Sequence, residues 1–321
     1  MKASSMASAL FGPVPSRRLG RSLGIDVIPP KTCTLDCLYC ESGPTTHRSL
    51  QRKAFIPPDR VLAELRAFLK EHAGSVDALT FSSAGEPTLY EPFGELISGI
   101  KAMGGRIPVV VLTNGTLLWD PEVRRSVKSA DRVVPSLDAA DPDVFSRLNR
   151  PHPHLSFHEV VEGLTAFRHE YQGAYHLEIL LVKGINDSPG HLRDLAALVR
   201  RIHPDRVELN TVVRPPAVPG IEGLSGQAMH EAAAFFTSCP VEIIASYERK
   251  GAVAPTDNLD ERVVQLVRRR PCSLEEMADA LSVAVEVVRA AVQRQREGGL
   301  LDVQDFEGHP FVVPVQRDDG H

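Results

Sequence analysis

Long hydrophobic runs are missing from this sequence, and so are internal repeats and low-complexity tracts. No apolar stretch approaches the roughly 18 residues that a membrane-spanning helix needs. The first ten residues contain no continuous apolar segment of the length found in signal peptides. We therefore expect a cytoplasmic protein with no membrane partner.

Cysteine is scarce, because the chain of 321 residues contains only five, at positions 33, 37, 40, 239 and 272. An odd number with three members close together is a poor disulfide framework and is typical of a metal site. We expect Cys239 and Cys272 to be plain thiols of the core or the surface.

The other three cysteines form the motif Cys33-x3-Cys37-x2-Cys40. Three thiolates can hold a 4Fe–4S cluster and leave its fourth iron without a protein ligand, so that this iron can bind a small molecule. The alternative is a zinc knuckle completed by His47. Zinc sites usually combine two short hooks, such as two Cys-x2-Cys pairs, whereas this chain has one trio. The motif therefore favours an iron–sulfur cluster as the metal group.

Charge is unevenly distributed along the chain. The formal net charge is −5, but residues 1–58 carry eight Lys and Arg against three acids, which leaves the remainder at −10. A basic patch beside the thiols would suit an anionic substrate or cofactor. A solvated basic surface explains the same charges equally well.

Strand-like and helix-like segments alternate over residues 23–245. The apolar patterns predict strands at 23–28, 76–82, 108–113, 132–137, 176–183, 206–213 and 241–245, with amphipathic helices between them. Such alternation predicts an α/β fold with a parallel sheet covered by helices. Six strand–helix units fit a partial (β/α)6 barrel of the TIM type, in which ligand chemistry lies at the carboxyl ends of the strands.

Polar clusters follow the predicted strands at that end. They are residues 33–40, 83–88, 113–115, 136–138, 186–187 and 210–214. Their convergence on one edge of the sheet predicts a single site. Arg17, Arg18 and Arg21 could cover its mouth, while Asn210, Thr211 and Arg214 could face a substrate. His152, His154 and His158 could bind a metal, although a loop that leads into a helix capped by Ser156 and Glu159 is favoured.

The expected domain organisation has four parts. An irregular N-terminal arm covers residues 1–22, the barrel covers 23–245, a linker covers 246–258, and a small domain covers 259–321. In the last part, three helices and a two-stranded wing, with a capping box at Ser273 and Glu276, predict a winged helix-turn-helix domain. Its net charge of −4 favours docking of a protein or peptide over binding of nucleic acid. A lid or a dimer element is the other interpretation.

The thiol motif, with Tyr39 directly before Cys40, resembles the signature of the radical S-adenosylmethionine (SAM) enzymes. The segment Gly85-Glu86-Pro87 resembles their Gly-Gly-Glu-Pro motif, with Ala84 in place of the first glycine. Residues 112–115 and 136–138 stand where the third and fourth strands of that family end. The resemblance covers about residues 20–245.

The resemblance implies a 4Fe–4S cluster on Cys33, Cys37 and Cys40, with SAM on its open iron. One electron from the reduced cluster, supplied by a donor such as flavodoxin or ferredoxin, cleaves SAM to methionine and a 5′-deoxyadenosyl radical, which removes a hydrogen atom from a substrate.

The resemblance also assigns roles to single residues. Tyr39 would lie near the adenine, and the carbonyls of the segment Gly85, Glu86 and Pro87 would receive the methionyl ammonium. The ribose or the carboxylate of SAM would meet Asn114, Ser136 and Asp138. Plain strand-end capping is the alternative for Ser136 and Asp138, and an ion pair that shapes the loop is the alternative for Glu86.

A narrower resemblance joins residues 11–26 and 209–216 to a prokaryotic group related to the wyosine-base tRNA synthases. Those enzymes carry extra cysteines for a second cluster, whereas this chain has only Cys239 and Cys272 left.

Two other classes of protein are alternatives to a radical SAM enzyme. One is a zinc-binding regulator that binds nucleic acid through its winged helix, and the other is a non-catalytic iron–sulfur protein.

Overall fold

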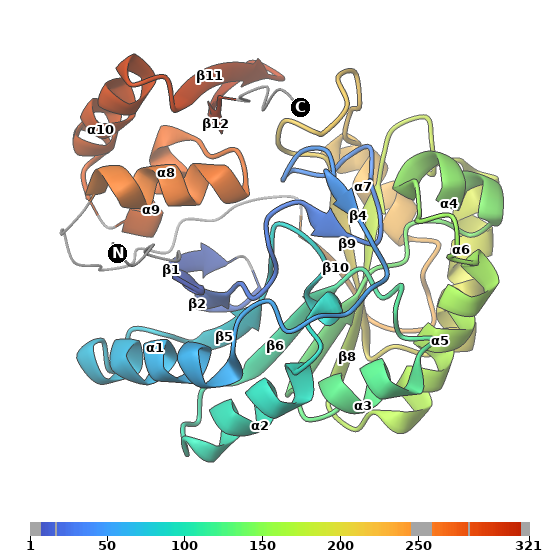
Figure 1. The fold of residues 1–321 in the computed structure, drawn as a ribbon. Coiled ribbons are helices and arrows are strands. Elements are labelled where there is room, and N and C mark those ends of the chain that lie inside the picture. The colour runs from blue at the N-terminus through green and yellow to red at the C-terminus, as the bar shows by residue number, and fades with distance from the viewer. Residues whose placement is uncertain (1–7, 17, 245–258, 282, 316–321) are drawn as a thin grey trace.

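The computed structural model describes residues 8–16, 18–244, 259–281 and 283–315. Its central element is a sheet with the strand order β1-β2-β5-β6-β7-β8-β9-β10 (Figure 1). The β1–β2 pair is antiparallel, and all other neighbours in this sheet are parallel. The fold is therefore α/β with a mostly parallel sheet, consistent with a partial barrel. The predicted linker 246–258 and Arg17 lie outside the described residues.

The seven parallel strands overlap the seven predicted ones. The strands of the sheet are β1 (Leu10–Ser16), β2 (Gly20–Ile25), β5 (Ala78–Phe81), β6 (Val109–Thr113), β7 (Arg132–Pro135), β8 (Ala174–Leu181), β9 (Arg206–Thr211) and β10 (Val241–Ile243).

The expectation that residues 11–22 are irregular is wrong. β1 and the first part of β2 lie there and form an antiparallel hairpin, whose register shifts between Phe11 and Val14. Gly12 and Pro13 fall inside that shift, where a bulge accommodates residues that ordinary strand pairing excludes.

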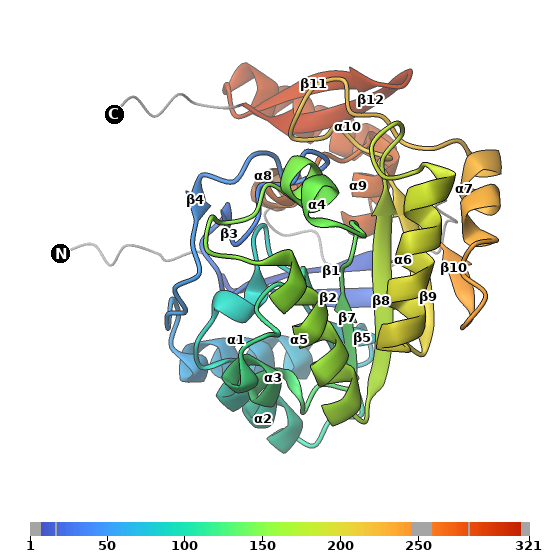
Figure 2. The same ribbon diagram turned by 90° about the vertical axis from the view of Figure 1, so that its right-hand side faces the viewer.

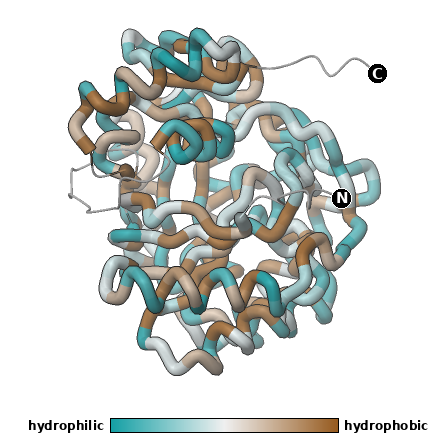
Figure 3. Tube along the Cα trace, turned by 60° about the vertical axis from the view of Figure 1, so that its left-hand side comes forward, coloured by the Kyte–Doolittle hydropathy of each residue, from teal (hydrophilic) through white to brown (hydrophobic). Residues whose placement is uncertain are grey.

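Helices pack on the outer side of the sheet (Figures 1 and 2). They are α1 (Pro58–Glu71), α2 (Phe93–Ala102), α3 (Pro121–Val127), α5 (Phe157–Glu170), α6 (Pro189–Ile202) and α7 (Gly226–Ala233), while α4 (Pro142–Asn149) and the short 3₁₀ helix η1 (Pro87–Leu89) lie in the loops after β7 and β5. Hydrophobic segments gather in the interior between these layers (Figure 3).

Burial alternates along β8 and defines the two sides of the sheet. Tyr175, Leu177, Ile179 and Leu181 are buried in the core that the helices cover, whereas the residues between them are partly exposed on the opposite side. Because side chains alternate across a strand, His176, Glu178 and Leu180 lie on the concave face.

Two helix starts lack a side-chain cap. In α1, Pro57 is the N-cap and Asp59 lies in the first turn. Ser156 is the N-cap of α5, but its side chain makes no capping hydrogen bond. Proline at the start of α1 already supplies a residue without an N–H, so that helix has less need of a polar cap.

Residues 259–315 form α8 (Leu259–Arg269), α9 (Leu274–Leu281), α10 (Val285–Glu297) and the hairpin of β11 (Leu301–Phe306) with β12 (His309–Pro314). We call them the C-terminal unit, and they enclose a hydrophobic core of their own. The capping box is confirmed, because the N–H of Glu276 donates to Ser273 Oγ at 3.2 Å and the N–H of Ser273 donates to Glu276 Oε2 at 3.1 Å. The elements have the predicted order, and the winged-helix assignment stays a prediction. None of the helices in the described ranges has the length and apolar character needed to cross a membrane.

Candidate functional site

The loop that carries the three cysteines follows β2 and contains the two-residue strands β3 (Thr32–Cys33) and β4 (His47–Arg48). Backbone hydrogen bonds hold it on two sides. The Glu86 N–H donates to the Thr32 carbonyl at 3.0 Å, and the Leu38 N–H donates to the Leu148 carbonyl at 3.0 Å. The loop is therefore fixed between the end of β5 and the end of α4.

Gly85 permits the first of these contacts. A Cβ atom on Gly85 would lie 2.1 Å from the carbonyl oxygen of Thr32, which is far inside van der Waals contact. Ala84 replaces the first glycine of the motif and is buried. Its carbonyl accepts the N–H of Lys31 at 2.6 Å, and this contact does not require a glycine. The close packing explains why glycine is needed at 85 and not at 84.

The three thiols lie close enough to oppose one another's ionisation. Burial raises the pKa of Cys33 to about 12, with smaller contributions from Glu86 and Cys40. Burial also raises the pKa of Cys37 well above its usual value, and the nearby Cys40 adds to this. Bound metal cations would reverse this balance, because they favour thiolates.

Two side-chain amides are directed at these sulfurs. Asn114 Nδ2 lies 3.5 Å from Cys33 Sγ, and Asn149 Nδ2 lies 3.4 Å from Cys37 Sγ. Donors of this kind stabilise negative charge on cluster sulfurs. Three sulfurs from one loop, with amide donors behind two of them, fit the ligand set of an iron–sulfur cluster with an open iron.

The geometry gives the zinc alternative no support. His47 is exposed on β4. Among the described residues, no three His, Cys, Asp or Glu side chains are arranged around one point as a single metal ion requires. His152 and His154 instead pack edge to face with ring centroids 5.3 Å apart, in the loop before α5.

Glu86 connects the loop after β5 to the end of β6. Its carboxylate accepts hydrogen bonds from the Thr88 N–H at 2.9 Å, the Thr113 hydroxyl at 2.6 Å and the Asn114 N–H at 2.8 Å. The Thr88 hydroxyl also donates to Glu86 at 2.6 Å, and no ion pair to Glu86 is present among the described residues. Burial raises the pKa of Glu86, and the hydrogen bonds oppose this shift. The Pro87 carbonyl accepts the N–H of Tyr90 at 3.0 Å, so one of its lone pairs is already used.

Asp138 connects the end of β7 to Tyr39. The Tyr39 hydroxyl and Asn149 Nδ2 both donate to Asp138 Oδ2, and the Leu180 N–H donates to Oδ1 at 2.9 Å. Burial raises the pKa of Asp138 to about 6. These contacts include the strand-end capping expected as an alternative, and they also fix the Tyr39 ring. Ser136 is partly exposed, and its N–H donates to the Thr113 carbonyl at 3.1 Å.

A cavity of about 390 Å³ opens beside this loop on the concave face of the sheet. Among the predicted site residues, Tyr39 and Cys40 line it; Arg18, Asn210, Thr211 and Arg214 line it as well. Arg21 does not, because it pairs with Asp77 at the surface.

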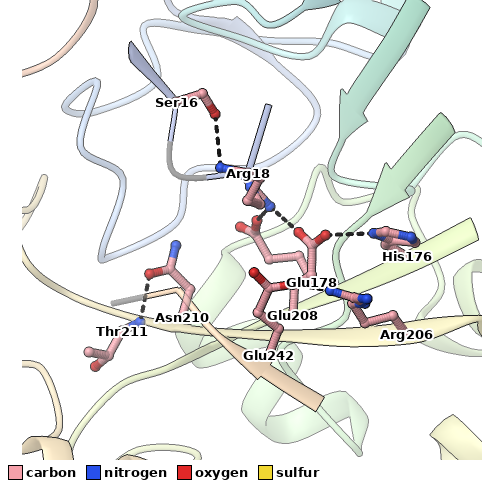
Figure 4. A network of polar contacts seen from close by, with 9 residues as sticks. All are labelled: Ser16, Arg18, His176, Glu178, Arg206, Glu208, Asn210, Thr211 and Glu242. Atoms are coloured by element: carbon pink, nitrogen blue, oxygen red, sulfur yellow. Dashed lines mark hydrogen bonds and ion pairs between the residues drawn. The ribbon is translucent and has the colours of Figure 1, made fainter. Parts of the chain in front are cut away.

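A charged network lies on the concave face of the sheet, and its members Arg18 and Glu178 line the cavity (Figure 4). The Arg18 guanidinium lies between the carboxylates of Glu178 and Glu208 and bonds to both. His176 Nδ1 lies 2.7 Å from Glu208 Oε1. The two carboxylates therefore neutralise Arg18 at the cavity wall.

The sequence did not single out Asn149, Glu178, Arg269 or Arg270. Asn149 is 3% exposed at the end of α4, and only the tertiary fold brings it to Cys37. The alternation of β8 could have indicated Glu178, because residues two apart on a strand share a face and Glu178 therefore lies on the concave face with Leu180.

Comparison with known proteins decides the family. The model of the Radical SAM superfamily matches residues 27–196, which include all three clustered cysteines. The chain belongs to the radical SAM superfamily. Members of this superfamily are generally enzymes, and membership implies a 4Fe–4S cluster and SAM.

The chain also belongs with the UPF0026 proteins. It is 34% identical to a UPF0026 protein of Helicobacter pylori (strain J99) over 269 residues, which are 83% of this chain and 86% of that protein. A Brachyspira hyodysenteriae protein named GTPase Obg is 36% identical over 90% of this chain, but the chain spans only 43% of that relative's length. A solved radical SAM methyltransferase from Sphaerobacter thermophilus shares the fold, with a TM-score of 0.56, 19% identity and coverage of 71% of this chain and 67% of its own.

Proposed function

We propose that this chain is an enzyme that cleaves SAM reductively and uses the resulting radical on a substrate bound in the cavity. When bound, the 4Fe–4S cluster and SAM supply the electron transfer and the 5′-deoxyadenosyl radical that abstracts hydrogen. Cys33, Cys37 and Cys40 hold the cluster, and the cavity beside them receives the substrate.

The other residues of the site position these groups. Asn114 and Asn149 donate to two cluster sulfurs, and Asp138 holds the Tyr39 ring at the cavity wall, where we place the adenine. The segment Gly85, Glu86 and Pro87 is the proposed seat of the methionyl ammonium. Ser136 and Asn114 are proposed to meet the ribose or the carboxylate.

One observation carries this proposal. The loop with three thiols opens, through Cys40 and Tyr39, on a cavity of about 390 Å³ at the carboxyl edge of the sheet. That volume is within the range of ligand sites, roughly 300–1,000 Å³. A cluster held by Cys33, Cys37 and Cys40 would lie next to this cavity, where it would supply the chemistry to a bound ligand.

Anaerobic reconstitution tests the proposal. We expect about four irons per chain, as a 4Fe–4S cluster requires, and 5′-deoxyadenosine after addition of dithionite and SAM. Cys37→Ala should abolish product, whereas the matched control Cys239→Ala should retain it. Product from Cys37→Ala, zinc in place of iron, or a cluster whose EPR spectrum ignores SAM would each refute the assignment.

We further propose three properties that follow from the sequence. A flavodoxin or ferredoxin supplies the electron, the enzyme is cytoplasmic, and the C-terminal unit is a winged-helix domain. Docking of a protein or peptide on that unit is favoured over nucleic acid because its sequence is acidic. A pull-down with reduced ferredoxin against reduced flavodoxin, followed by turnover with each, tests the first of these.

A further inference from the structure

The C-terminal unit forms one wall of the cavity. Leu266, Arg269 and Arg270 line it together with Tyr39 and Cys40 of the cysteine loop. We call these three residues the roof. In Figure 1 the C-terminal unit, in orange and red, lies over the β1–β2 hairpin. The roof therefore meets whatever substrate the cavity holds.

Specific contacts fix the roof in place. The Arg269 guanidinium pairs with the partly buried Asp26 and lies 3.7 Å from the centroid of the Phe11 ring. The Ser42 hydroxyl, two residues beyond Cys40, donates to the Arg269 carbonyl at 2.7 Å. These contacts connect the roof to the hairpin and to the cysteine loop, so its side chains have defined positions at the cavity.

A second charged contact connects the same regions. The buried Arg214, which follows β9, bonds to Glu276 of α9 and to Glu41 at 3.2 Å. Charge-assisted bonds with two carboxylates neutralise this guanidinium within the protein, although its buried Nε has no hydrogen-bond partner among the described residues.

Four arginines line the cavity, and their pairing differs. Arg18, Arg214 and Arg269 each bond to one or two carboxylates. For Arg270, in contrast, no side-chain hydrogen bond or ion pair is present among the described residues, although it is half-buried at the cavity wall. A guanidinium withdrawn from water without a carboxylate is a favourable partner for a ligand oxyanion, which it can bind with two parallel N–H bonds.

We propose that Arg270 binds an oxyanion group, a carboxylate or a phosphate, on the substrate of this enzyme. The inference rests on the proposed function, because it takes the cavity as the substrate site. The enclosed volume suits a small molecule, or the end of a longer one, that carries this group. Arg270 is thereby a specificity-determining residue contributed by the C-terminal unit, and the roof recognises substrate as well as enclosing it.

The test measures binding and does not need turnover. Inorganic phosphate and acetate are titrated separately into the full-length reconstituted protein by calorimetry, for wild type, Arg270→Gln, Arg270→Lys and Arg268→Gln. Arg268 is the matched control, because it is exposed near the end of α8, two residues before Arg270. We expect at least one anion to bind wild type and Arg268→Gln equally, at least tenfold weaker binding to Arg270→Gln, and partial recovery in Arg270→Lys. Preference for phosphate or for acetate tells which oxyanion the substrate carries.

Three results would overturn the inference. The first is that neither anion binds wild type, and the second is that the anions bind Arg270→Gln and Arg268→Gln equally. The third is that Arg270→Gln loses SAM binding to the same extent as anion binding, which would assign the guanidinium to the cofactor. The SAM-dependent change in the cluster's EPR spectrum separates this inference from the proposed function. If wild type shows that change while Arg270→Gln binds anions normally, only the inference fails.

Discussion

Replacing Asn149 by leucine should lower the reduction potential of the cluster. The Asn149 amide is buried and donates to Cys37 Sγ at 3.4 Å. Adding an electron makes the sulfurs more negative, so this hydrogen bond stabilises the reduced cluster more than the oxidised one. A net hydrogen bond contributes about 1 kcal/mol. Only the difference between the two redox states shifts the potential, and about 59 mV corresponds to 1.4 kcal/mol for one electron, so we expect a negative shift of up to roughly 40 mV.

The assay is an anaerobic redox titration of the EPR signal of the reduced cluster. Asn210→Leu is the matched control, since Asn210 lines the cavity and its Oδ1 accepts the N–H of Thr211 at 3.0 Å, with no bond to a cysteine sulfur among the described residues. Asn149→Leu should also lose about 1–3 kcal/mol of stability, because Asp138 loses a buried donor. A fully loaded Asn149→Leu cluster with the wild-type potential would refute the reasoning.

Three further predictions concern the scaffold. Gly85→Ala should reduce iron per chain after reconstitution, because its Cβ would lie 2.1 Å from a carbonyl oxygen of the cysteine loop, whereas Gly190→Ala, with open space around it, should not. Burial raises the pKa of Cys272 to about 11, so only about one thiol in a thousand is ionised at pH 8. The rate of iodoacetamide labelling, followed by mass spectrometry, should therefore rise about tenfold per pH unit up to pH 11. Ser273→Ala should lower the free energy of unfolding in urea by about 1 kcal/mol, while Ser156→Ala, which removes no capping bond, should cost clearly less.

Local patterns predicted the sheet well. Short apolar runs bounded by turn residues placed every parallel strand, because a strand covered by helices must be apolar on its buried face. β1 was not predicted, because Gly12 and Pro13 normally indicate the end of a strand. In the structure a bulge in the pairing with β2 accommodates both residues. The same limit applies to Ser156, where the capping sequence is present and the capping bond is not.

The site was predictable only where its residues are close in sequence. The three cysteines and the Gly85 segment carry their own signatures. Asn149 lies 112 residues from Cys37, and Arg269 lies 243 residues from Asp26, so their contacts follow from the fold alone. Hydrogen bonds to sulfur and the pairing of buried charges are therefore properties that a sequence pattern does not reveal.

The contact of Arg269 with Asp26 has a consequence for biosynthesis. The ribosome completes the cysteine loop more than 200 residues before it reaches Arg269, so the growing chain presents its thiols at an open face of the sheet. Domains fold in order during synthesis at about 5–20 residues per second, which leaves at least roughly 10 seconds before the roof can form. Iron delivery therefore has a window in which the thiols are accessible, and the last helices to fold close it.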